Sequence, residues 1–146
     1  MHVIITGSRK IVGFDSQSFI SNVLATAPFP IESITHGGAV GADVRAARYA
    51  AMLDIPQLRF PCTTKDWKVW GRGAGHRRNR IMVNETIKRF GVENVIVLAF
   101  YLDAKLPDGT PDPDENRGTR GCANYALSKG LTVHYFGWTR PSIPKD

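Results

Sequence analysis

The chain has 146 residues, of which 42% are hydrophobic and 22% charged, a composition typical of one soluble globular domain that buries its own core. Its apolar runs are only as long as strands, which excludes a membrane-spanning helix, and a first strand that begins at His2 or Val3 leaves no room for a signal peptide. The net charge of +6 favours an anionic partner without choosing between a nucleotide and a nucleic acid.

Strands and helices are predicted to alternate along the chain. Continuous apolar runs predict strands over residues 3–6, 31–35, 58–60, 95–100 and 132–136, and such runs are typical of strands covered on both faces. Apolar residues spaced three and four apart predict helices that begin near residues 16, 41, 76 and 118. These helices are expected to end before Pro28 and near residues 53, 90 and 129.

This order predicts an α/β fold, a single Rossmann-like domain over residues 1–137 with a mostly parallel five-stranded sheet and helices on both faces. We interpret residues 101–117, which are polar and contain three prolines, as a mobile loop or lid, and residues 138–146 as a C-terminal tail. Cys62 and Cys122 lack metal-like spacing, so we expect two reduced thiols and a cytoplasmic location.

A glycine-rich turn, residues 36–43 with the sequence HGGAVGAD, follows the second predicted strand and opens the second predicted helix. Glycines allow close approach of a ligand, and a helix N-terminus offers unpaired N–H groups, so His36, Gly37, Gly38 and Gly41 are candidate phosphate-binding residues. The alternative is a tight connection in which Asp43 stabilises the first helical turn. On the first interpretation, Gly41→Val should abolish ligand binding while the domain stays folded.

Three of the predicted helices place a polar side chain at the start of their apolar face: Asp43, Asn79 and Thr119. Each starts at the carboxyl end of a strand, where ligands bind in open α/β sheets. Helix capping favours the same residue types and is the alternative for each. Two further segments lie at carboxyl ends, and their candidate ligand-binding residues are Gly7, Ser8, Arg9 and Gly118.

Basic and aromatic residues gather before the third large helix. Arg72, Arg78 and Asn79 are candidates for holding a phosphate, a ribose or a base, and the alternative is a solvated helix start. Trp67 and Trp70 suit stacking on a base, or packing under the glycine turn or at a subunit contact. The acidic residues between 108 and 115 lack EF-hand spacing, so no metal site and no cofactor is predicted.

Four motifs taken together resemble the SLOG superfamily, most closely its YspA-like branch, a domain of unknown function known from phage and bacterial genomes. They are IITGSR (residues 4–9), HGGAVGAD (36–43), Trp67 followed by GRGAGHRRNRIM (71–82), and Gly118-Thr119. The resemblance implies a Rossmann-like fold that binds nucleotides or nucleotide-derived signals, and by analogy a homo-oligomer. It extends more distantly to DNA-processing protein A.

One related branch, the LOG-type phosphoribohydrolases, cleaves the bond between a base and ribose 5′-monophosphate with the signature PGGxGTxxE. This chain keeps only Gly118-Thr119 of that signature, and Cys122 stands where the glutamate belongs. A thiol does not stabilise the cationic ribose of the transition state as a carboxylate does. The chain therefore resembles a binding protein, or an enzyme that uses another carboxylate, of which Asp43 is the best candidate.

Three functional hypotheses follow. The first is binding of a nucleotide or nucleotide-derived small molecule, as a sensor or a sequestering protein. The second is hydrolysis of the N-glycosidic bond of nucleoside monophosphates with Asp43 as the catalytic residue, and the third is single-stranded nucleic-acid binding through residues 72–80 and the two tryptophans. No membrane is among the expected partners.

Overall fold

All five predicted strands form one sheet, and every pair of neighbours is parallel. A computed structural model of the chain describes residues 1–113 and 115–140. The strands are β1 (His2–Gly7), β2 (Ser33–His36), β3 (Gln57–Arg59), β4 (Val95–Leu102) and β5 (Thr132–Trp138), in the order β3-β2-β1-β4-β5. The predicted α/β, Rossmann-like fold is confirmed.

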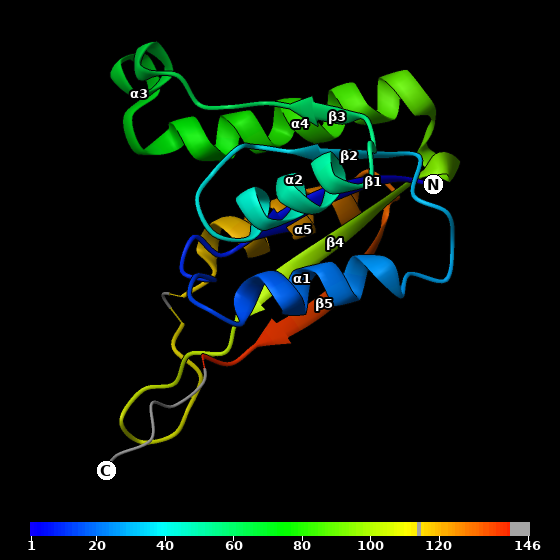
Figure 1. The fold of residues 1–146 in the computed structure, drawn as a ribbon. Helices are drawn as coiled ribbons and strands as arrows, with labels where there is room; N and C mark the ends of the chain where they lie inside the picture. The colour runs from blue at the N-terminus through cyan, green and yellow to red at the C-terminus, as the bar shows by residue number, and fades with distance from the viewer. Residues whose placement is uncertain (114, 141–146) are drawn as a thin grey trace.

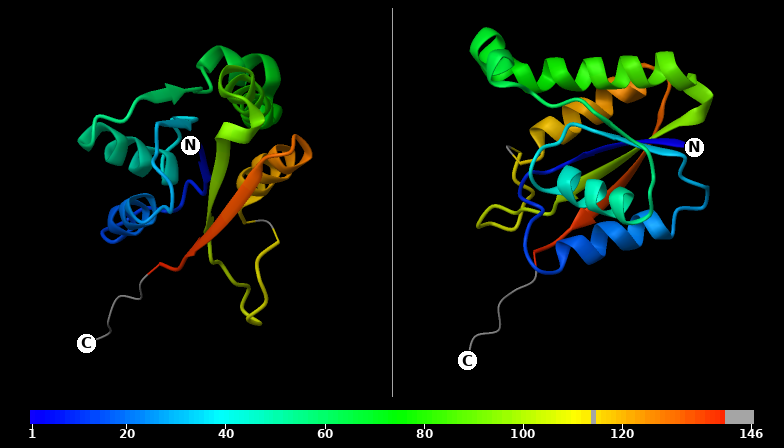
Figure 2. Two further views of the ribbon diagram at one scale, coloured as in Figure 1. Left: turned by 90° about the vertical axis from the view of Figure 1, so that its right-hand side faces the viewer. Right: turned by 45° about the horizontal axis from the view of Figure 1, so that its top comes forward.

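Two helices cover each face of this sheet. α1 (Ser16–Ala25) and α2 (Ala42–Met52) lie on one side, and α4 (Ala74–Phe90) and α5 (Arg117–Ser128) lie on the other (Figures 1 and 2). A further helix, α3 (Thr64–Trp70), projects beyond the sheet at the start of α4 (Figure 1). Short 3₁₀ turns, Gly71–Gly73 and Val92–Asn94, come before and after α4.

The core has two halves because the central strands are buried on both faces. In β1, Val3 and Ile5 pack with α1 and α2, whereas Ile4 between them packs with Met82 of α4 and Cys122 of α5. Alternating side chains point to opposite faces of a strand, so an unbroken apolar run is what a doubly covered strand requires. Within the described residues, no helix is long and apolar enough to cross a membrane.

Helix α3 was not predicted, although its signal is in the sequence. The Thr63 side chain accepts a hydrogen bond from the Asp66 amide at 3.1 Å, and the Asp66 carboxylate accepts one from the Thr63 amide at 2.8 Å. This reciprocal capping box starts a helix that buries none of its residues. The pattern was missed because a helix without a buried face has no apolar periodicity to detect.

Two element boundaries also differ from the predictions. α4 begins at Ala74 and includes Gly75, so the non-helical segment that precedes this helix is shorter than expected. β5 continues through Gly137 to Trp138, whose ring is buried in the core half that contains α1 and α2. The residues predicted as a tail therefore begin with part of the sheet, and residues 141–146 lie outside the described residues.

The strand order places a switch point at the centre of the sheet. β1 lies between β2 and β4, the chain leaves β1 toward α1 on one face, and it leaves β4 toward α5 on the other. Connections that diverge to opposite faces open a crevice beyond the carboxyl ends of the two strands, which is where such folds bind ligands. The register Gly7↔Phe100 fixes where these two ends meet.

Candidate functional site

A cleft of about 320 Å³ lies at this switch point. The end of β1, the first turns of α4 and α5, and one residue of α2 form its walls. Most of the predicted site residues line it: Gly7, Ser8, Arg9, Asp43, Arg72, Arg78, Asn79, Gly118 and Thr119. The three polar residues predicted at helix starts meet here, and Asp43, Asn79 and Thr119 are only 5%, 8% and 3% exposed.

The other predicted site residues lie elsewhere. Gly37, Gly38 and Trp67 line a second cavity of about 320 Å³. Arg9, Ala39 and Arg78 line both cavities, so the two adjoin. His36 and Gly41 line neither of them.

Four amides of the glycine-rich turn, which was expected to bind a phosphate, donate hydrogen bonds within the protein. The amides of Gly37 and Ala39 donate to Oδ2 of Asp43 at 3.0 and 3.3 Å. The Gly38 amide donates to Nδ1 of His36 at 3.0 Å, and the Ala42 amide at the start of α2 donates to the Ser8 carbonyl at 3.3 Å. The amides of Gly37, Gly38, Ala39 and Ala42 are therefore used within the chain.

His36 has a structural position rather than a place in the cleft. Its side chain is 1% exposed, and its Nε2 lies 2.8 Å from Oε1 of Gln57. Because Nδ1 accepts a hydrogen bond from Gly38, the proton of a neutral ring must be on Nε2, which then donates to the glutamine oxygen. Both ring nitrogens are used within the protein.

Asp43 is the buried carboxylate of the cleft. Burial raises its pKa above the usual 3.8, while His36, Arg78 and the amides of Ala39 and Gly37 act in the opposite direction. The amides of Gly37 and Ala39 both donate to Oδ2, and Asp43 lines the cleft. Such a group can accept a hydrogen bond from a ligand hydroxyl, or take up and release a proton.

The raised pKa of Asp43 predicts a specific pH dependence of stability. Between the unfolded pKa near 3.8 and the higher folded pKa, the folded chain keeps a proton that the unfolded chain has lost, so the contribution of Asp43 to stability decreases as the pH rises. The free energy of unfolding of the native protein minus that of Asp43→Asn is expected to fall with pH over this window. Urea denaturation of both proteins from about pH 4 to pH 8 checks it, and a difference that grows with pH would contradict it.

Arg78 holds three segments together. Its Nη1 donates to the carbonyl of Gly37 at 2.9 Å and to that of Phe60 at 3.4 Å, and its Nε donates to Oδ1 of Asn79 at 2.8 Å. A Cβ on Gly37 would lie 2.0 Å from Nη1, so glycine is needed there to let the guanidinium approach. Arg78 was predicted as a phosphate ligand, whereas these three hydrogen bonds are made to the protein itself.

The N-terminus of α5 faces the cleft through Gly118 and Thr119. Asn116, which precedes the helix, makes no side-chain cap in the part of the chain that the structure describes. Instead, Oδ1 of the Asn116 side chain accepts a hydrogen bond from the Leu102 amide, and its Nδ2 donates one to the Leu102 carbonyl, each at 2.8 Å. A Cβ on Gly118 would meet nothing within 4 Å, so a ligand has room to approach this residue from the cleft.

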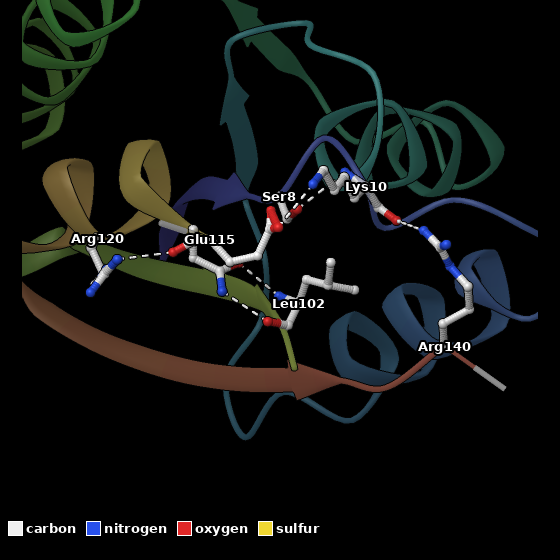
Figure 3. A network of polar contacts seen from close by, with 7 residues as sticks. Ser8, Lys10, Leu102, Glu115, Arg120 and Arg140 are labelled. Carbon is white, nitrogen blue, oxygen red and sulfur yellow. Dashed lines mark hydrogen bonds and ion pairs between the residues drawn. The ribbon is translucent and has the colours of Figure 1, made fainter. Parts of the chain in front are cut away.

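Two cleft residues, Lys10 and Glu115, were not predicted. Lys10 Nζ lies 2.8 Å from Glu115 Oε2, and the Lys10 amide donates to Ser8 Oγ at 3.1 Å (Figure 3). Arg120 Nη2 donates a hydrogen bond to the Glu115 carbonyl at 2.9 Å, and Arg140 Nη2 donates one to the Lys10 carbonyl at 3.3 Å (Figure 3). No sequence signal joins residues 105 positions apart. These contacts fix one end of the segment predicted as a lid.

Cys122 lies under the cleft floor. Burial raises the pKa of its thiol to about 11, so it is neutral at physiological pH and cannot replace a carboxylate. Both cysteines are free, as predicted. Among the residues that the structure describes, no three His, Cys, Asp or Glu side chains gather as a metal site would require.

The two exposed tryptophans border different cavities. Trp67 lines the cavity beside the glycine-rich turn. Trp70 lines a different cavity of about 310 Å³, and Arg77 Cζ lies 4.6 Å from its ring centroid.

Comparison of the chain with protein-family models, with curated proteins and with solved structures gives no match.

Proposed function

We propose that the protein binds a nucleotide or a nucleotide-derived small molecule in the cleft at the switch point. The observation that carries this proposal is the position of the N-terminus of α5, which lines a cleft together with Arg9 and Arg72 beyond the carboxyl ends of β1 and β4. A helix N-terminus with nearby guanidinium groups favours a phosphate. The resemblance of the motifs to the SLOG superfamily supports the same class of ligand.

The remaining cleft residues suit the sugar. Oδ2 of Asp43 is held by two amides, which leaves Oδ1 for a ribose hydroxyl. Asn79 lies next to it in the cleft with its Oδ1 engaged by Arg78, so the amide nitrogen is the group that can donate to a ligand. A protein with this arrangement can sense or sequester a signal without changing it.

Calorimetric titration with AMP, GMP, CMP and UMP, and with the matching nucleosides, tests the proposal. At least one monophosphate is expected to bind about 10-fold or more tighter than its nucleoside, because only the monophosphate reaches the helix N-terminus. Arg72→Ala is expected to weaken that binding by about 10-fold.

The matched control is Arg89→Ala, which removes the same charge from the far end of α4. It is expected to leave affinity unchanged at about 0.15 M salt. Equal affinities for nucleoside and monophosphate, or equal effects of the two arginine variants, would show that the cleft is not the phosphate site.

Hydrolysis of the N-glycosidic bond is the second candidate, favoured by one observation. Asp43 is a buried carboxylate with a raised pKa in the cleft, and such groups often act as acids, bases or electrostatic stabilisers. Chromatography would detect free base released from the bound monophosphate. Release by the native protein that is lost in Asp43→Asn would establish hydrolysis. Binding without release of base would leave the binding function alone.

A further inference from the structure

We infer that the cavity beside Trp67 receives the nucleobase of a ligand whose phosphate lies at the N-terminus of α5. This inference rests on the proposed function and adds the position of the base. The cavity is lined by Trp67, Pro61 and the glycine-rich turn. Because Arg9, Ala39 and Arg78 line it and the cleft alike, one ligand can occupy both.

Three backbone amides of the cavity wall are not available to a second phosphate. The wall includes Gly37, Gly38 and Ala39, whose amides all donate to Asp43 or His36. The Gly37 carbonyl in turn accepts from Arg78. Amides that already donate within the chain offer little to an anion, and Pro61 and Trp67 supply the apolar part of the wall.

Trp67 supplies the opposite surface. Its side chain lies on exposed α3 and is 41% accessible, although an indole normally finds a partner. The guanidinium of Arg9 lies over it, with Cζ 5.8 Å from the ring centroid. Because Arg9 lines both cavities, it lies where the base and the phosphate of one nucleotide would meet.

Trp70 provides the contrast that makes the assignment testable. It is on the same helix and is 51% exposed, but it borders a different cavity, which shares Pro61 and Arg78 with the first and shares only Arg78 with the cleft. Substituting either tryptophan removes the same aromatic area from α3. Only the loss of Trp67 should affect a base that lies next to the cleft.

The experiment compares ribose 5-phosphate with the tightest-binding nucleoside monophosphate from the titrations above, on the native protein, Trp67→Leu and Trp70→Leu. The native protein is expected to bind the nucleotide about 10-fold or more tighter than ribose 5-phosphate, the range that stacking of one base supplies. Trp67→Leu should erase this preference and leave the affinity for ribose 5-phosphate unchanged. Trp70→Leu should retain both affinities.

A second measurement serves if Trp67→Leu does not fold. In Trp70→Leu the remaining tryptophans are Trp67 and the buried Trp138, so nucleotide should quench the fluorescence and ribose 5-phosphate should not. Equal native affinities for the two ligands, or an equal loss of both in Trp67→Leu, would overturn the base assignment and leave the phosphate site standing. Failure of the native protein to bind either ligand would overturn the proposed function and this inference with it.

Discussion

Gly41→Val is expected to destabilise the folded protein by about 3 kcal/mol or more. Gly41 has φ +93° and ψ −129°, a conformation that is open to glycine and strained for any residue with a Cβ. A Cβ there would lie 2.3 Å from the Ser8 carbonyl oxygen and 2.7 Å from Cα of Arg9, and neither backbone atom can move aside without breaking the contact between β1 and α2.

Urea denaturation measures this loss, with Gly75→Ala as the control. A Cβ on Gly75 meets nothing within 4 Å, and alanine inside α4 should stabilise the protein by roughly 0.5–1 kcal/mol. The result would correct the expectation that Gly41→Val removes ligand binding from an intact domain. A valine variant as stable as the native protein would instead show that the loop after β1 adapts.

Arg78→Ala is expected to cost about 2–4 kcal/mol of stability. The guanidinium bonds the carbonyls of Gly37 and Phe60, which belong to the segments after β2 and β3, and thereby ties both to α4. Alanine would leave these carbonyls without a partner and the glycine-rich turn without its support.

Arg77→Ala is the matched control, because Arg77 precedes Arg78 on α4 and contacts the exposed ring of Trp70. Its loss should cost less than about 1 kcal/mol. Urea denaturation of both variants at one pH and salt concentration makes the comparison. Similar costs for the two would mean that Arg78 contributes no more than an exposed side chain.

The sheet and the convergence of three polar residues could be predicted because both follow from periodicity. Alternating apolar runs and helical patterns predict parallel strands with helices between them. Asp43, Asn79 and Thr119 each begin a buried helical face at the carboxyl end of the sheet, and the structure brings them into one cleft. Spacing along a helix is local information, which a sequence contains.

The hydrogen bonds of the glycine-rich turn could not be predicted, because their partners are set by tertiary packing. The sequence shows that amides of residues 37–42 can point outward, but not that Oδ2 of Asp43 turns back to two of them. The contact between Ala42 and the Ser8 carbonyl depends on how closely α2 approaches β1. The pairing of Lys10 with Glu115 is likewise a product of the fold.

The central position of β1 has a consequence for the order of folding during synthesis. His2 pairs with Ser33 on one side and with Val95 on the other, so one edge of the first strand stays open until most of the chain has left the ribosome. Pairing across such a separation is slow, and an apolar strand with a bare edge is prone to association with other chains. The nascent protein is therefore most vulnerable to aggregation before β4 emerges. We expect the yield of folded protein to depend more on growth temperature than on the stability of the finished fold.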